Sequence, residues 1–436
     1  MNSSKGHETV SNFFALAFAQ YGSMFCSMFF SLWLTRLLLP ADFGLVAIGL
    51  FYFSSFNWIT EWGWEQGLIA HKEIPVESAA STHFLIRFVL GFLPLVLFTI
   101  GYPWFKTFLF IGQYKILLLL AVAYWIEKMS YTYRSLLERE NRLKNLAAFE
   151  ILAIILSFSL ALLAAQKGAG VVSLVIQRLA EKTVLLVGYW WSSSWKFGIS
   201  FSFKVVTIFF KTFGFATWLG AVFGLALYDF MPFLIGNIKG PSEAGLYVKA
   251  FTLGTFPLML TAIFSRLTTP LYTRYQMQNN EIRAVFFKAQ ILKFCMIFPL
   301  QLFLVVTADI WIAHLFGAPW VPMIPLYRLM ALYGFCRAFF DDVPNLFSYG
   351  FKNPWVLTQN QILQSVVILS FGPFLIYKIG GLGGAITSVF SMMVGMVLIW
   401  LVVWKKLFCS KKIVIMTLYE LYEQAKVLVL KGLRRS

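Results

Sequence analysis

The chain has 436 residues, of which 59% are hydrophobic and only 13% are charged. Soluble domains average about 45–50% apolar and about 25% charged residues, so this composition excludes a soluble globular protein and indicates an all-α polytopic membrane protein. The formal net charge of +17 is typical of a membrane protein with basic cytoplasmic loops, and we expect no nucleic acid as a partner.

Twelve apolar stretches are long enough to cross a bilayer, which takes about 20 residues. In chain order they are 13–38, 42–60, 79–101, 108–130, 146–165, 171–191, 206–230, 243–267, 285–307, 323–345, 356–377 and 382–404. Lysines and arginines gather in the loops on the side of the N-terminus and in the C-terminal segment, so both termini are expected in the cytoplasm. Lys128 is placed near the cytoplasmic end of its span, where its side chain can reach the interface, and Lys249 is assigned to the outer side.

One short motif occurs twice at the outer ends of predicted spans. The segments 40–45 (PADFGL) and 241–246 (PSEAGL) share the spacing Pro-x-Asp/Glu-x-Gly-Leu. Proline suits the first position of a helix, and an acid in the first turn meets the positive end of the helix dipole. Because an even number of spans separates the copies, they predict two six-helix lobes in the same orientation, 1–195 and 196–408. The tail, 409–436, is predicted to be a basic amphipathic helix on the inner leaflet.

Several basic residues lie deep within the predicted spans. One charge facing lipid at the bilayer centre costs about 2.5–3.5 kcal/mol, so these residues must face protein, water or an anion. Glu181 and Asp341 lie at helical spacing from Arg178 and Arg337 and offer internal partners, but the other spans concerned hold no acid at such spacing. The positive surplus predicts an anionic ligand. The residues predicted to bind it are Arg87, Arg178, Lys182, Lys293, Arg328 and Arg337.

Four further polar residues are candidates for ligand contacts or for a gate. Asn57 and Glu61, toward the inner end of the second span, can hydrogen-bond the hydroxyl groups of a ligand, although capping and interfacial roles suit them equally. Arg36 and Asp42 at the outer rim can form a gate contact or stabilise the turn. The sequence has no P-loop, no HExxH motif and no CxxC pair, so we predict no catalytic residue, no metal site and no cofactor.

Four stretches resemble bacterial polysaccharide and O-antigen flippases of the multidrug/oligosaccharidyl-lipid/polysaccharide exporter superfamily. The segments 35–56 (TRLLLPADFGLVAIGLFYFSSF) and 61–69 (EWGWEQGLI) resemble the opening of that family. The segment 229–272 resembles its seventh and eighth spans, and 315–332 (LFGAPWVPMIPLYRLMAL) resembles its ninth-to-tenth turn.

The resemblance implies a MATE-like fold of two lobes and twelve to fourteen helices around a cationic cavity. It implies that an undecaprenyl-pyrophosphate-linked oligosaccharide, the repeat unit of an O-antigen, capsule or exopolysaccharide, is moved from the inner to the outer leaflet of the bacterial inner membrane. The partners implied are this lipid-linked oligosaccharide, membrane lipids, and polysaccharide polymerase and chain-length machinery.

Two alternatives stay open. A multidrug or cation antiporter of the same superfamily should carry a buried carboxylate in its first bundle, whereas the first predicted span contains no acid. A membrane polysaccharide polymerase or ligase needs a sizeable outer loop or acids near the first outer turn, whereas the outer loops are short and Asp42 stands alone there.

Overall fold

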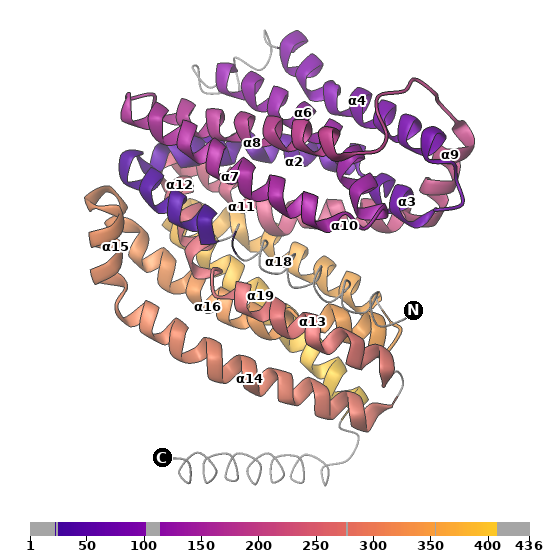
Figure 1. The fold of residues 1–436 in the computed structure, drawn as a ribbon. Coiled ribbons are helices and arrows are strands. Elements are labelled where there is room, and N and C mark those ends of the chain that lie inside the picture. Colours follow the sequence, from indigo (N-terminus) through magenta and orange to yellow (C-terminus); the bar gives the residue numbers. More distant parts are fainter. Residues whose placement is uncertain (1–21, 23–24, 102–113, 276–277, 354, 408–436) are drawn as a thin grey trace, which may run out of the picture. The chain divides into compact units, whose positions relative to one another are not determined.

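The computed structural model describes residues 22, 25–101, 114–275, 278–353 and 355–407 (Figure 1). Within these ranges the chain forms helices joined by short turns and contains no strand, which confirms the predicted all-α class. Seven of the described helices are long and apolar enough to cross a membrane. The count of twelve spans stays a prediction, because parts of predicted spans 1 and 4 lie outside the described residues, as does the tail, 409–436.

The described chain divides into two compact units that alternate along the sequence. The first unit holds the described residues up to Ala250, together with Asp309–Leu326 and Phe371–Gly384. The second holds Phe251–Ala308, Tyr327–Ser370 and the described residues from Ala385 onward. The predicted lobe boundary between residues 195 and 196 stays a prediction.

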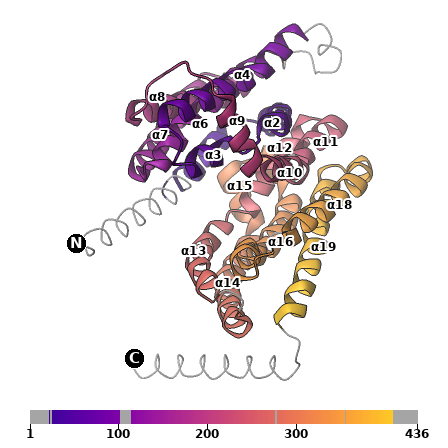
Figure 2. The same ribbon diagram turned by 90° about the vertical axis from the view of Figure 1, so that its right-hand side faces the viewer.

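The first unit is a bundle of long apolar helices. Those that lie wholly or mainly in it are Phe25–Leu37, α2 (Pro40–Thr60), α3 (Trp64–Ala70), α4 (Val76–Ile100), α6 (Tyr114–Arg139), α7 (Leu143–Gln166), α8 (Val171–Ser192), α9 (Phe203–Phe209), η1 (Phe210–Gly214), α10 (Phe215–Gly224), η2 (Leu225–Asp229), α11 (Phe230–Lys239), α12 (Pro241–Gly254), α15 (Ala308–Phe316) and η3 (Ala318–Met323). In this bundle α4 packs on α6, α6 on α8, and α8 on α7 (Figures 1 and 2).

The predicted span 206–230 is one part of a longer helical run. Residues from Phe203 to Lys239 form a continuous run of 37 residues that includes two π-helical turns, η1 and η2. The run ends only where Gly240 adopts a φ of 97°, which a residue with a side chain rarely adopts. Span prediction placed its end too early because hydropathy does not detect where the backbone can turn.

The second unit contains α13 (Leu258–Arg274), α14 (Asn279–Val306), α16 (Ile324–Phe340), α17 (Val343–Asn345), η4 (Leu346–Gly350), and most of α18 (Trp355–Ile379) and α19 (Gly381–Leu407). The predicted span 243–267 is divided into α12, which ends at Gly254, and α13, which begins at Leu258 just after Pro257. The carbonyl of Gly254, released at this break, accepts a hydrogen bond from Gln301 Nε2 at 3.2 Å. The same amide group donates to Ala331 O at 2.9 Å, so α14 ties the break to α16.

The two copies of the repeated motif begin equivalent helices and pack against each other within the first unit. α2 starts at Pro40 and α12 starts at Pro241, as the motif predicts. A Cβ atom built on Gly44 would lie 1.7 Å from Pro241 O, and one built on Gly245 would lie 1.8 Å from Pro40 O. The backbones of the two first turns therefore touch reciprocally, which is the contact expected of two related elements.

Candidate functional site

Two glutamates lie at the corner where α2 ends and α3 begins. α2 ends at Thr60, and Gly63 then adopts a left-handed conformation with a φ of 74° that turns the chain into α3. A Cβ atom at Gly63 would lie 2.4 Å from Phe213 Cβ, so glycine is also required by the close packing. The corner places Glu61 just after α2 and Glu65 in the first turn of α3.

Arg87 on α4 is fully buried and is held by both glutamates. Its Nη2 donates to Glu61 Oε2 at 2.7 Å and contacts Glu65 Oε1, while Nη1 donates to Glu61 Oε1 at 3.2 Å. The planar guanidinium matches a carboxylate through two parallel hydrogen bonds. Arg87, for which no acid was found within its own span, thus has its counter-charges at the α2–α3 corner.

Lys128 on α6 is buried, which corrects the prediction that its side chain reaches the interface. The residue is 2% exposed, and its Nζ contacts Glu61 Oε1 and donates to Asn57 Oδ1 at 3.0 Å. The ammonium also lies 4.9 Å and 5.0 Å from the ring centroids of Tyr124 and Tyr131. The prediction was wrong because depth along one helix does not show an acid that a different element brings beside it.

Two bases on α8 share an acid on α6. Lys182 Nζ forms ion pairs with Glu127 Oε1 at 2.8 Å and with Glu181 Oε1 at 2.9 Å. Arg178, one turn earlier, lies 3.9 Å from Glu127 Oε2, and its side chain is 34% exposed. Glu181 also accepts a hydrogen bond from Gln177 at 2.9 Å. The expected pairing of Arg178 with Glu181 along the helix is replaced by pairing between helices.

We call these eight side chains the ionic cluster. They are Arg87, Lys128, Arg178, Lys182, Glu61, Glu65, Glu127 and Glu181. Four bases face four acids, so the positive surplus predicted for this part of the chain is absent from the cluster itself. Sequence reasoning missed Glu65 and Glu127 because their partners lie on other helices, where no sequence spacing indicates them.

A polar cavity of about 190 Å³ lies beside the ionic cluster. Its walls come from α2, α6 and α8. The lining residues are Leu50, Phe53, Ser54, Asn57, Leu120, Ala123, Tyr124, Glu127, Lys128, Tyr131 and Arg178. Tyr124 OH donates to Asn57 Oδ1 at 3.1 Å, so amide, hydroxyl and charged groups converge beside aromatic rings. Polar groups that converge on one cavity are typical of ligand sites.

Lys249 on α12 is buried inside the first unit, which corrects its assignment to the outer side. The residue is 6% exposed, and its Nζ donates to Ser31 Oγ at 2.7 Å and lies 4.1 Å from the centroid of the Phe43 ring. Within the described residues no carboxylate is placed to neutralise it. The repeat aligns Lys249 with Ile48, so the equivalent position of α2 is apolar and buried. Packing alone therefore does not require a lysine here, and a buried charge of this kind is a candidate functional group.

The remaining predicted cations lie in the second unit. Lys293 on α14 is fully buried, Arg337 on α16 is half-buried and Arg328 on α16 is exposed. Asp341 and Asp342 attract the Lys293 ammonium electrostatically, although they are distant from it in sequence.

The two rim residues have different environments. Asp42 Oδ2 accepts a hydrogen bond from the Leu39 backbone N–H at 2.9 Å, which caps the first turn of α2. Arg36 is exposed. Of the two roles predicted for Asp42, a gate contact or stabilisation of the turn, this hydrogen bond is the one that stabilises the turn.

Comparison with protein-family models matches residues 33–325 to the family described as "Polysaccharide biosynthesis protein". The chain is 24% identical over 283 residues to the teichuronic acid biosynthesis protein TuaB of Bacillus subtilis, covering 64% of this chain and 58% of TuaB. It is 22% identical over 328 residues to the lipopolysaccharide biosynthesis protein WzxC of Escherichia coli, covering 72% of this chain and 64% of WzxC. The chain thus spans about three fifths of the length of these relatives.

Solved structures show the same fold. An inward-facing multidrug resistance MATE family transporter of the MOP superfamily aligns with a TM-score of 0.69 at 15% identity, covering 88% of this chain and 94% of that one. The lipid II flippase MurJ aligns with a TM-score of 0.67 at 12% identity, covering 89% and 87%. At these identities the likeness establishes the fold alone, and it confirms the predicted MATE-like class.

Proposed function

The chain belongs to the polysaccharide biosynthesis protein family, and from that premise we propose that it carries a lipid-linked oligosaccharide across the bacterial inner membrane. The substrate is an undecaprenyl-pyrophosphate-linked repeat unit of an O-antigen, capsule or exopolysaccharide, and it moves from the inner to the outer leaflet by alternating access. Both termini are cytoplasmic. The activity is transport and not catalysis. The match of the family model over residues 33–325 is the observation that carries the proposal.

In the first unit, the charges of the ionic cluster divide into structural and ligand-facing groups. Arg87 and Lys182 are engaged by carboxylates at hydrogen-bonding distance and position the cluster. Arg178 lines the polar cavity, is one third exposed, and its ion pair with Glu127 is long at 3.9 Å. A guanidinium has five N–H donors, so Arg178 can grip phosphate oxygens while keeping this contact. Asn57 offers its amide to sugar hydroxyls.

Lys249, which sequence reasoning assigned to the outer side, is a further proposed phosphate-binding group. Its ammonium exchanges a neutral partner, the Ser31 hydroxyl, for a charged oxygen when the pyrophosphate arrives. In the second unit, Lys293, Arg328 and Arg337 are the proposed cationic contacts for the substrate. Substrate binding then shifts the balance between inward-open and outward-open states.

A cation-coupled antiporter is the second candidate, because Glu61 and Glu127 are carboxylates within the first bundle. Each of them is already paired with basic side chains, which leaves little negative charge for a cationic drug. We therefore rank transport of an anionic, lipid-linked sugar first.

The decisive test is deletion of the gene in its native host, followed by extraction of lipid-linked intermediates. A flippase predicts accumulation of complete, unpolymerised repeat units on the inner leaflet. Single units that reach the outer leaflet without polymerising would instead identify a polymerase or ligase. Normal polymer with altered drug tolerance would identify the antiporter.

Complementation of that deletion tests the ligand-facing cations. Arg178→Gln and Arg328→Gln are each expected to lower export at least about tenfold, the effect of one lost charge-assisted contact, while the protein remains in the membrane. Arg134→Gln is the matched control, because Arg134 is 49% exposed and its ion pair in the described part of the chain is with Glu138 on the same helix. Normal export by both test variants would contradict the anion-binding role.

Lys249→Met is expected to separate stability from transport. Methionine removes a buried charge that no carboxylate compensates, so the melting temperature in detergent should stay equal or rise. Export should fall about tenfold or more because one charge-assisted phosphate contact is lost. Lys249→Arg keeps the charge and should retain part of the export. Undiminished export by the methionine variant would remove Lys249 from the transport path.

A further inference from the structure

A buried tryptophan of η3 holds the end of the helix Phe25–Leu37 within the first unit. Trp320 is 1% exposed, and its indole Nε1 donates to Thr35 O at 3.0 Å, across 285 residues of sequence. Both residues belong to the first unit. The hydrogen bond therefore fastens η3 to the last turn of this helix.

The carbonyl of Thr35 is available because of how that helix ends. The last carbonyls of a helix have no partner within it, and this helix ends at Leu37. The N–H of Leu39, four residues after Thr35, donates instead to Asp42 Oδ2 at 2.9 Å. Thr35 is fully buried, so its carbonyl needs a partner from the protein. Trp320 supplies that partner.

Phe43, in the first turn of α2, contacts both Trp320 and Lys249. The ring centroids of Phe43 and Trp320 lie 5.5 Å apart at an interplanar angle of 73°, an edge-to-face arrangement. Lys249 Nζ lies 4.1 Å from the centroid of the Phe43 ring, over its face, and donates to Ser31 Oγ at 2.7 Å. We call Phe43, Lys249 and Trp320 the latch.

The latch lies beside the point where the two copies of the repeated motif touch. Phe43 precedes Gly44, whose Cβ atom would lie 1.7 Å from Pro241 O. Lys249 lies on α12 about one helical turn after Gly245, the other glycine of this contact. In the orientation proposed above, these helix starts form the outer rim of the first unit. Alternating access requires that rim to be closed while the binding site is open to the cytoplasm.

We propose that Trp320 and Phe43 are positioning residues that hold the outer rim closed, and that Lys249 releases them when it binds the phosphate of the substrate. The inference rests on the proposed function, in which the Lys249 ammonium exchanges the Ser31 hydroxyl for a phosphate oxygen. An ammonium drawn to phosphate leaves the face of Phe43, and the ring then keeps only Trp320 of its two partners in the latch. Substrate binding thereby favours the outward-open state, because a ligand shifts an equilibrium toward the state that it binds better.

The rate at which a thiol at Thr35 reacts with a maleimide measures opening of the rim. The Thr35 side chain is fully buried, and only its backbone carbonyl meets Trp320, so Thr35→Cys keeps the latch intact. The full chain carrying this reporter is placed in lipid nanodiscs, where both faces meet the buffer. The same protein without the reporter gives the background from the four native cysteines.

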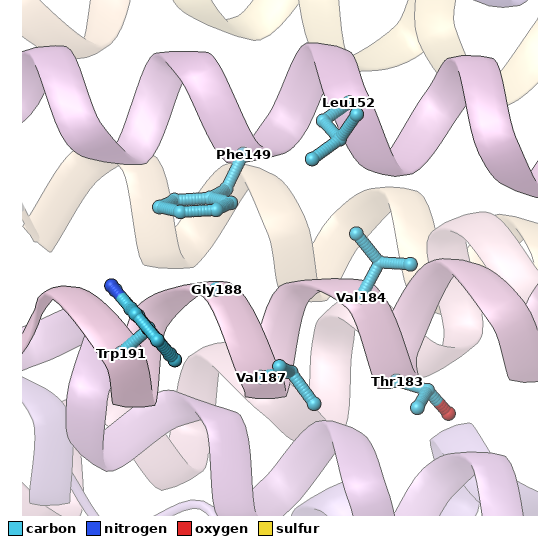
Figure 3. A pocket seen from close by; sticks show the side chains of 7 residues that line it. All are labelled: Phe149, Leu152, Thr183, Val184, Val187, Gly188 and Trp191. Atoms are coloured by element: carbon cyan, nitrogen blue, oxygen red, sulfur yellow. The ribbon is translucent and has the colours of Figure 1, made fainter.

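Removal of the indole donor is expected to open the rim. Trp320→Phe keeps a ring beside Phe43 but loses the hydrogen bond to Thr35 O, so the reporter should react about fivefold faster, the effect of one lost hydrogen bond. Trp191→Phe is the matched control and should leave the rate unchanged. Trp191 is 75% exposed and borders an apolar groove of about 470 Å³ between α7 and α8, whose lining is uncharged and includes no residue of the latch (Figure 3).

Inorganic pyrophosphate, which stands in for the phosphate groups of the substrate, tests the release. It should speed the reaction of the reporter about fivefold, the effect of one lost cation–π contact. Lys249→Met keeps a side chain of similar length that can contact Phe43 through its sulfur, so the rate without pyrophosphate should stay within about twofold. Pyrophosphate should no longer change that rate, a loss of response that a merely structural role of Lys249 would not produce.

Three results would overturn the proposal: equal rates in the Trp320→Phe and Trp191→Phe proteins, a reporter protein that does not respond to pyrophosphate, or a response that survives Lys249→Met. The response of the reporter protein does not depend on the folding of any latch variant. Failure of this inference and failure of the proposed function are distinguishable. If the deletion strain accumulates no lipid-linked repeat unit, the flippase function fails. If it does accumulate them while the reporter shows no opening, only the latch fails.

Discussion

Replacing Arg87 with methionine is expected to lower the free energy of unfolding by about 3–5 kcal/mol, the cost of breaking a buried ion pair by removing one partner. Arg87 is fully buried and contacts Glu65, whose other basic neighbour at ion-pair distance in the described chain is the His83 ring, with Nε2 at 4.0 Å. Loss of Arg87 leaves Glu65 with this imidazole as its nearest basic group and leaves Glu61 with Lys128 alone. The uncompensated charge, and not the lost contact, dominates the effect.

Thermal and denaturant unfolding in detergent, together with the yield of folded protein, would measure this loss. Arg134→Met is the matched control, because the Arg134–Glu138 pair lies along the surface of α6, where an ion pair contributes about 0.2–1 kcal/mol. The stability of the Arg87→Lys protein should lie between those of the Arg87→Met and Arg134→Met proteins, since a lysine keeps the charge but cannot form the two parallel hydrogen bonds. Equal stability of the Arg87→Met and Arg134→Met proteins would refute the structural role of the cluster.

Gly44→Ala and Gly245→Ala are each expected to destabilise the protein by about 3 kcal/mol or more, at or above the upper end of ordinary overpacking. A methyl group on either glycine would lie within 2 Å of a backbone carbonyl oxygen of the other motif. If the nearest atom belonged to a side chain, that side chain could rotate away from the new methyl group. The nearest atom is instead a backbone carbonyl oxygen in the first turn of a helix, which cannot rotate away. The helices α2 and α12 must therefore move apart or fail to pack.

The same substitution at Gly220 is the control, because a Cβ atom there meets no atom within 4 Å. Gly220→Ala should leave the melting temperature unchanged or slightly raised, since alanine favours the helix by about 1 kcal/mol over glycine. Melting curves and export assays on all three variants would check the prediction. A Gly44→Ala protein as stable as the control would show that the two first turns do not touch in the membrane.

The repeat could be predicted because both copies use local chemistry. Proline at a helix start and an acid in the first turn act within one turn, so their spacing is visible along the chain. The structure confirms the helix starts at Pro40 and Pro241. The sequence does not show that Gly44 and Gly245 are the points of contact. That depends on where two helices meet, which no local preference encodes.

The candidate site could be predicted only in part. Arg87, Arg178 and Lys182 were recognised as membrane-embedded charges and do lie in the ionic cluster with Glu61, while Asn57 accepts a hydrogen bond from Lys128 of that cluster. Substrate binding by these residues stays a prediction. Apart from Glu181 on α8 itself, the acids that neutralise them come from a helix corner and from a neighbouring helix. Compensation of this kind depends on distances of a few ångströms between elements, because the interaction of two charges falls with their separation.

By itself, the sequence determined the membrane class, the helical fold, the positions of most long helices and the kinship with the polysaccharide biosynthesis protein family. These features depend on composition, on the length of apolar runs and on motifs read within a single turn or span. Only the tertiary structure decided that Lys128 and Lys249 are buried, that the first unit's cluster is charge-balanced, and that an apolar groove opens between α7 and α8. Burial of a side chain and pairing of two charges depend on which helix surfaces pack against each other. They cannot be predicted from the periodicity of one helix, because they arise only when the helices pack together.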